Sequence, residues 1–153
     1  MTGNEIPEDD HVVRYVKPSL IDGETVDGGA FVLKLSETGL SVNWLEVLVG
    51  NGHDKQLDEV RRLSRLGMSK NGRFAKLNVG DTKQYISDNA EASGISMVLN
   101  ITEAPLAATH QFEADPSHAE ITGLPLIDSD EAMLIGDLIS ACIQGSLYHA
   151  IDN

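Results

Sequence analysis

Cysteine is almost absent from this chain of 153 residues, which contains a single one, Cys142. An intrachain disulfide is therefore excluded, and so is a zinc site built from several thiolates. Cys142 lies in an apolar run, where a small buried hydrophobic residue is expected. The low cysteine content is typical of proteins from a reducing compartment.

Long apolar runs are also missing. No window of the sequence approaches the roughly 20 uninterrupted apolar residues that a membrane-spanning helix needs. The first ten residues, MTGNEIPEDD, are acidic and lack the basic and apolar regions of a secretory signal. We therefore expect a cytoplasmic protein without membrane contact, in which residues 1–9 are a disordered acidic leader and residues 10–153 form a single globular domain.

The sequence lacks a complete catalytic motif of the GxSxG, HExxH, Walker A or EF-hand type. His118-Ala119-Glu120 matches the local signature of zinc-dependent deaminases, in which the histidine binds zinc and the glutamate moves protons. Those enzymes take two further zinc ligands from a Pro-Cys-x-x-Cys motif, which a chain with one cysteine cannot provide. We therefore expect no metal site and no cofactor.

Positive charge is scarce and unevenly distributed. The chain has 11 Lys and Arg against 24 Asp and Glu, a net charge of -13. Residues 55–83 nevertheless hold 8 basic and 3 acidic residues, whereas residues 84–153 hold 11 acidic residues and no basic one. This separation indicates either that the basic segment contacts acidic parts of its own chain or that it binds an acidic partner.

Alternation of apolar and polar residues predicts several strands. Leu40–Val49 begins with such alternation and continues with a denser apolar run. Two interpretations of this segment remain open, either a single strand or a strand that is followed by a helix. The other predicted strands are His11–Val16, Ala30–Leu35, Phe74–Val79, Ser96–Thr102 and a short one around His118, Ala119 and Ile121.

Two shorter helices are predicted in the middle of the chain. Asp54 is a suitable N-cap for Lys55–Leu66, in which an apolar residue recurs at every third position, and Gly67 ends the helix. A second helix is predicted over Asp81–Asn89, which begins at a capping aspartate.

The longest predicted helix runs from Ser129 to Ala150 and begins with a capping box of Asp128 and Glu131. Its residues are apolar around most of the circumference, which is typical of a central core helix or of a subunit interface. Together the elements predict an α+β domain, with a mainly antiparallel sheet of about five or six strands packed on this long C-terminal helix and on one shorter amphipathic helix.

One set of residues is a candidate for catalysis. His118 with Asp115 and Glu120 would support a small hydrolase or transferase, because a carboxylate next to an imidazole orients it for proton transfer. The alternative is structural, since an aspartate at the start of a turn commonly accepts hydrogen bonds from the backbone.

A second set is a candidate for partner binding. It comprises Arg61, Arg62, Arg65, Arg73 and Trp44, because arginine and tryptophan are frequent at interface hot spots. We expect a non-enzymatic protein that binds another protein with an acidic surface. Weak binding of nucleic acid through residues 55–83 is a lesser alternative, because the acidic remainder of the chain repels a phosphate backbone.

Three segments, Gly29–Phe31, Leu40–Glu46 and Asp115–Gly123, resemble a pattern of small, functionally uncharacterised bacterial proteins. In that pattern an "AF" strand, an "LSV" strand and a "DPxHAxIxG" strand follow in this order. Proteins of this kind occur among accessory components of bacterial defence loci. The resemblance therefore implies an accessory protein of a type III-E CRISPR system or a similar locus, which acts within a protein complex, and it implies no catalytic residue.

Overall fold

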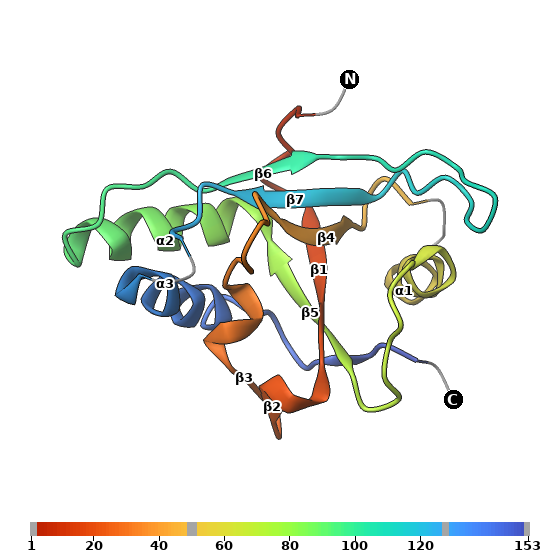
Figure 1. Cartoon of the computed structure of the whole chain (residues 1–153), viewed down its shortest axis with the longest axis horizontal. Coiled ribbons are helices and arrows are strands. Elements are labelled where there is room, and N and C mark those ends of the chain that lie inside the picture. Colours follow the sequence, from red (N-terminus) through yellow and green to blue (C-terminus); the bar gives the residue numbers. More distant parts are fainter. Residues whose placement is uncertain (1–2, 49–51, 127–128, 152–153) are drawn as a thin grey trace.

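The computed structural model describes residues 3–48, 52–126 and 129–151. In this part of the chain six strands form one antiparallel sheet in the order β6-β7-β4-β1-β5-β8 (Figure 1). These strands are β1 (His11–Val16), β4 (Leu40–Trp44), β5 (Arg73–Asn78), β6 (Asn100–Glu103), β7 (His118–Thr122) and β8 (Tyr148–His149). A separate hairpin pairs β2 (Ile21–Asp22) with β3 (Thr25–Val26).

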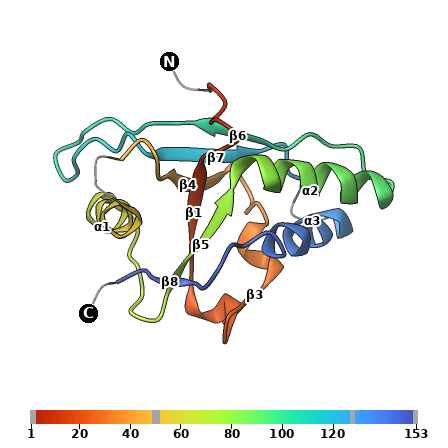
Figure 2. The same cartoon turned by 180° about the vertical axis from the view of Figure 1, so that it is seen from behind.

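Helices cover both faces of the sheet. They are α1 (His53–Leu63), α2 (Val79–Ala92) and α3 (Asp130–Ser140), with two short 3-10 helices, η1 (Pro18–Leu20) and η2 (Gly28–Phe31). Helix α1 lies on one side of the sheet, and α2 and α3 lie on the other (Figures 1 and 2). The predicted α+β class, with a mainly antiparallel sheet of five or six strands, is confirmed.

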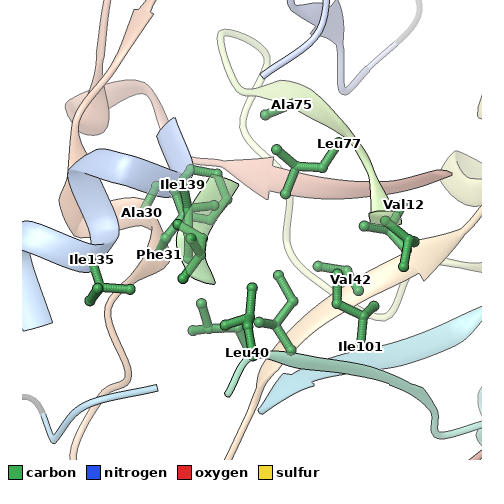
Figure 3. Close-up of a cluster of buried hydrophobic side chains, with 14 of the residues drawn as sticks. Val12, Ala30, Phe31, Leu40, Val42, Ala75, Leu77, Ile101, Ile135 and Ile139 are labelled. Atoms are coloured by element: carbon green, nitrogen blue, oxygen red, sulfur yellow. The ribbon is translucent and has the colours of Figure 1, made fainter. Parts of the chain in front are cut away.

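Neighbouring residues of β1 supply the two cores, because successive side chains of a strand point to opposite faces. Val12 belongs to the larger core, with Phe31 of η2 and Ile139 of α3 (Figure 3). Val13 belongs to a smaller core, which contains the apolar stripe of α1, namely Leu57, Val60 and Leu63. The first three apolar residues of the predicted stripe therefore mark the side that packs on the sheet. The prediction that the helix continues to Leu66 is wrong, because α1 ends at Leu63 and Leu66 is 59% exposed.

The sheet changes direction between β1 and β4. Strands β6, β7 and β4 run across the view in Figure 1, whereas β1 and β5 run down it. Register pairs between β1 and β4 are limited to Val12 with Trp44 and Val13 with Asn43, whereas β1 pairs with β5 along its whole length. The register does not continue to Arg14 of β1 and Val42 of β4, where the two strands separate, and this corner positions the candidate site.

The prediction of a strand over Ala30–Leu35 is wrong. Residues Gly28–Phe31 form η2 instead, because the side chain of Asp27 accepts a hydrogen bond from the Gly29 backbone and turns the chain into a helical conformation. Ala30 and Phe31 are then buried beneath α3. An apolar run of this length is compatible with either conformation, and the aspartate cap decides between them.

The predicted C-terminal helix begins as expected but is too long. The Ser129 hydroxyl accepts a hydrogen bond from the Ala132 N–H and caps α3, while Asp128 lies outside the described residues. The helix ends at Ser140, and Gly145 with φ 63° redirects the chain so that Tyr148–His149 pair with β5 as β8. The inner face of α3, which includes Ile135 and Ile139, is buried in the chain's own core.

Residues 3–6, part of the segment expected to be a disordered leader, lie along β6 instead. The backbone N–H of Ile6 donates to the Ile101 carbonyl at 3.0 Å, and Glu5 forms an isolated antiparallel bridge with Thr102. Only 2% of Ile6 is exposed. This segment covers the outer edge of β6, which would otherwise present unpaired backbone groups.

Other boundaries shift by a few residues. Helix α1 begins at His53 after Gly52, so Asp54 lies in its first turn and is not the N-cap. Helix α2 is longer than predicted because Asn78 caps it, its side chain accepting from the Asp81 N–H. Strand β4 ends at Trp44, and the described residues after it form a turn, so no helix follows directly.

The contact between α3 and η2 depends on two glycines, and Gly136→Ala tests it. A methyl group at Gly136 would overlap the Gly28 carbonyl oxygen. Alanine favours an isolated helix over glycine by about 1 kcal/mol, but overpacking costs typically about 1 to 3 kcal/mol. We expect urea denaturation to show a lower free energy of unfolding for Gly136→Ala. The control Ser87→Ala, at an exposed position of α2, should be neutral or slightly stabilising. A stabilised Gly136→Ala would contradict the close packing of α3 on η2.

Candidate functional site

A pocket of about 140 Å³ lies at the corner where β1 and β4 separate, beside the C-terminal end of α1. It brings together residues from both predicted sets, since His118 and Asp115 of the catalytic set and Arg65 of the binding set all line it. Its polar lining comprises Arg14, Tyr15, Ser41, Asn43, Ser64, Arg65, Asp115 and His118. Two more open hollows, of about 390 and 430 Å³, lie at the end of α2 and beside α3 and contain none of the predicted residues.

Arg14 projects from β1 into the gap between the separating strands. Its Nε donates to the Ala30 carbonyl and its Nη1 donates to the Ser41 carbonyl, each at 2.8 Å. Burial lowers the pKa of Arg14, and the charge of Glu37 partly opposes that shift. Among the described residues Arg14 forms no ion pair. The hydrogen-bond partners of its guanidinium there are these two carbonyl oxygens. The sequence does not mark Arg14 as a site residue, because its position in the alternating segment HVVRYV is that of an ordinary exposed strand residue.

Asp115 is buried and closes the turn before β7. Its Oδ1 accepts from the Ser117 N–H at 2.9 Å and from the Ser117 hydroxyl at 2.6 Å. Its Oδ2 accepts from the Asn43 side-chain amide at 3.2 Å. These hydrogen bonds give Asp115 the structural role that the sequence left open, that of an acceptor at a turn. No hydrogen bond joins Asp115 to His118 among the described residues.

His118 instead contacts Ser41. The Nδ1 atom lies 2.7 Å from the Ala104 carbonyl oxygen, which can only accept, so Nδ1 carries the hydrogen. In the neutral imidazole the Nε2 atom is then an acceptor, and it lies 3.2 Å from Ser41 Oγ. This arrangement is a serine and a histidine within hydrogen-bond distance, with the histidine oriented by a third group. Ser41 was missed because no sequence motif surrounds it, and only the register of β4 against β7 brings it close to His118.

Glu120, the third residue of the predicted catalytic set, does not line the pocket. In the sheet register it lies opposite Ser41 on β4 and opposite Thr102 on β6. Its side chain extends toward Gly39, where an added Cβ would meet Glu120 Oε2 at 2.9 Å. The three predicted catalytic residues therefore do not assemble around one another.

Arg61 and Arg62 of α1 contact acidic groups and carbonyls of their own chain. Arg61 donates from Nε and Nη2 to the His149 carbonyl, at 3.1 and 2.7 Å, and forms an ion pair with Asp58 at 2.7 Å. Arg62 forms ion pairs with Glu59 at 2.8 Å and with Glu113. The hydrogen bond from Arg62 lowers the pKa of Glu59.

Arg65 holds the connection between β6 and β7 (residues 104–117), which we call the β6–β7 connection. Its Nη2 donates to the carbonyls of Ala107 and Glu113, at 2.7 and 2.9 Å. Its guanidinium carbon lies 5.3 Å from the centre of the Phe112 ring, which is a cation–π contact. Arginines of the basic segment therefore contact acidic and carbonyl groups of their own chain. Contact within the chain is the first of the two alternatives that the charge distribution left open.

Arg73 and Trp44 both form hydrogen bonds within the chain and are partly buried. Arg73 is partly buried and donates to the Gly72 carbonyl at 2.9 Å. Trp44 is partly buried, packs against the larger core and donates from Nε1 to Asp10 at 2.9 Å. Both residues are thereby engaged within the fold.

No group of three or more His, Cys, Asp or Glu side chains in the described ranges is arranged to hold a metal ion. None of the described helices combines the length and the apolar character needed to cross a bilayer.

Asp115→Ala separates the structural role of Asp115 from a catalytic one. The substitution leaves the Ser117 N–H and hydroxyl without their acceptor in a buried place, and it removes one of the two acceptors of the Asn43 amide, the other being Ser117 Oγ. We expect it to lower the free energy of unfolding by about 2 to 3 kcal/mol in urea denaturation. The control Asp88→Ala, at an exposed position of α2, should change it by less than about 0.5 kcal/mol. Equal stability of the two variants would exclude the structural role.

Comparisons with models of protein families, with curated proteins and with solved structures find no match for this chain. The resemblance to accessory proteins of defence loci stays a hypothesis.

Proposed function

We propose that this chain is a non-enzymatic accessory domain that binds another protein. The observation that carries the proposal is an exposed apolar surface next to arginines at the mouth of the pocket. Leu66 is 59% exposed and Phe112 is 38% exposed. Arg65 is adjacent to Leu66 in sequence, and its guanidinium contacts the Phe112 ring. We call Arg62, Arg65, Leu66 and Phe112 the Leu66–Phe112 surface.

The composition of this surface suits recognition of a protein. Apolar and aromatic side chains supply area that is removed from water on binding, and arginine adds charge-assisted hydrogen bonds. The Arg62 side chain is 48% exposed, so it remains accessible beside its contacts with Glu59 and Glu113. A partner with an apolar residue flanked by carboxylates fits such a surface.

The geometry narrows the set of binding residues that the sequence predicts. Arg61 holds the backbone near the C-terminus, Trp44 packs on the core, and Arg73 contacts its neighbouring carbonyl. Arg62 and Arg65 remain as the arginines next to exposed apolar side chains. The same internal contacts weaken the nucleic-acid alternative, because an arginine engaged by its own chain must exchange that contact for a phosphate.

The biological setting of the proposal rests on the resemblance alone. The segments Gly29–Phe31, Leu40–Glu46 and Asp115–Gly123 support an accessory component of a bacterial complex, in a CRISPR-associated or similar defence system. Affinity purification of the tagged chain from its own cells would identify the protein that it binds there.

Leu66→Asp tests the binding surface once that protein is purified. A carboxylate placed in the apolar centre of the surface should weaken binding by about tenfold or more in titration calorimetry. The matched control is Leu35→Asp, since Leu35 is the same residue type, is 82% exposed and lies in another part of the fold. Both variants should keep the wild-type melting temperature. Unchanged affinity of Leu66→Asp would remove the proposed surface.

The contact between Ser41 and His118 favours a second candidate, a small hydrolase. In such an enzyme Ser41 Oγ attacks an ester carbonyl and its proton passes to His118 Nε2. The leaving alcohol then takes this proton, and water releases the acyl group from Ser41. This candidate keeps His118 from the predicted catalytic set and replaces Asp115 and Glu120 by Ser41 and the Ala104 carbonyl.

A fluorophosphonate reagent tests this second candidate, because it forms a covalent bond only with an activated serine and releases fluoride. If the pair is catalytic, mass spectrometry should find the label on Ser41, and His118→Gln should slow labelling by about a hundredfold. Ser64→Ala, which changes another serine of the pocket, should label at the wild-type rate. An unlabelled wild-type protein would exclude the hydrolase.

A further inference from the structure

We infer that the pocket between β1, β4, β7 and the end of α1 binds a small oxyanion, a carboxylate or a phosphate group. The inference concerns a ligand in the pocket itself and goes beyond protein binding by the Leu66–Phe112 surface. It does not require Ser41 to be a nucleophile.

Two guanidinium groups that line the pocket have unused donors. The Nε atom of Arg65 is buried and has no hydrogen-bond partner, although its Nη2 contacts two carbonyls. Arg14 uses Nε and Nη1, and its Nη2 forms no hydrogen bond within the described ranges. A buried donor without a partner, here Arg65 Nε, is unfavourable, and an oxyanion held by the two guanidinium groups would provide acceptors for their free donors.

Neutral donors of the pocket are also available. The Tyr15 hydroxyl accepts from the Ser69 N–H at 2.8 Å, and its own hydrogen is left to donate. The Ser64 hydroxyl accepts from the Leu66 N–H at 3.2 Å and is left to donate in the same way. Hydroxyl groups and guanidinium groups together are the donors that carboxylate and phosphate sites use.

The carboxylates near the pocket do not cancel its cations. Asp115 is the carboxylate that lines it, and both of its oxygens already accept hydrogen bonds from Ser117 or Asn43. Glu113 contacts Arg62 with its side chain, and the Glu37 charge acts on Arg14. The lining therefore has two guanidinium groups and one carboxylate, with His118 as a further polar group.

The size of the pocket limits what enters it. A volume of about 140 Å³ is well below the roughly 300 to 1,000 Å³ of pockets that hold drug-sized molecules. A single carboxylate or phosphate group fits, whereas a whole nucleotide does not. The group belongs either to a free small ion or to the end of a larger molecule, such as an acidic side chain of the partner protein.

Titration of the isotope-labelled full chain with inorganic phosphate, and separately with acetate, tests the inference by NMR. At constant ionic strength we expect saturable shifts of the backbone signals of Ser41, Ser64 and Arg65 with at least one of the two anions. Chloride at the same ionic strength should not produce them. Absence of saturable shifts with both anions would overturn the inference, as would equal shifts with chloride.

Variants assign the shifts to the pocket. Arg65→Gln should weaken the binding of the anion by about tenfold, the effect expected for loss of a charge-assisted hydrogen bond. Tyr15→Phe removes one donor and keeps the ring, so it provides a second variant that tests the pocket if Arg65→Gln does not fold. The control Arg73→Gln removes one positive charge outside the pocket and should leave binding unchanged. Equal weakening by Arg73→Gln would show nonspecific charge attraction and overturn the inference.

Competition identifies the source of the anion. If the partner inserts an acidic side chain into the pocket, phosphate or acetate should weaken capture of the partner by the wild-type chain. If a free ion is the natural ligand, capture should not depend on either anion. Failure of the Leu66–Phe112 surface would appear instead as unchanged partner binding by Leu66→Asp, with the anion-induced shifts still present.

Discussion

The short pairing between β1 and β4 is the constraint on which the rest of the structure depends. These strands share two register pairs and then separate, and Arg14 bridges the gap by donating to Ser41 of β4 and to Ala30 of η2. The separation lets β4, β7 and β6 run across β1 and β5 (Figure 1). A ladder that continued along both strands would close the gap and leave no pocket.

Arginines of the basic segment, residues 55–83, bind other parts of the chain near this corner. Arg65 follows α1, the helix that covers the smaller core, and from there it holds the β6–β7 connection by two carbonyls and an aromatic ring. Arg61 holds the chain near its C-terminus in a similar way. A net charge of -13 therefore describes a chain whose basic segment is largely used to bind its own acidic and carbonyl groups. The predicted partner surface is correspondingly smaller than the set of arginines suggests.

Local patterns predicted the parts of the fold that local physics decides. The stripe of Leu57, Val60 and Leu63 and the start of α3 near Ser129 depend on residues within a few positions of one another, although the residue that caps α3 is Ser129 and the predicted cap was Asp128. The C-terminal helix was predicted too long because Ile143 and Leu147 are apolar in either conformation, and pairing of β8 with β5 decides their course. Such pairing depends on residues that are distant in sequence, and the local periodicity of apolar residues does not predict it.

The candidate site was predictable only in part for the same reason. His118 and Asp115 stand out because they are close in sequence to a turn, and both line the pocket. Ser41 and Arg14 lie in ordinary alternating strands and become site residues through the register of β4 and the gap beside β1. Arg65 was predicted from its charge, but the group that it contacts, the β6–β7 connection, follows from the fold alone.

Arg65 holds the β6–β7 connection in place and thereby completes the pocket. Hydrogen–deuterium exchange of the wild-type chain and of Arg65→Gln measures this directly, because the amides of Leu106 and Asp115 are paired with each other across the connection. Because Arg65→Gln removes the guanidinium that contacts the connection, we expect faster exchange of these two amides in the variant, with unchanged protection of β1 and β5. Equal exchange at Leu106 and Asp115 in both proteins would contradict this role of Arg65.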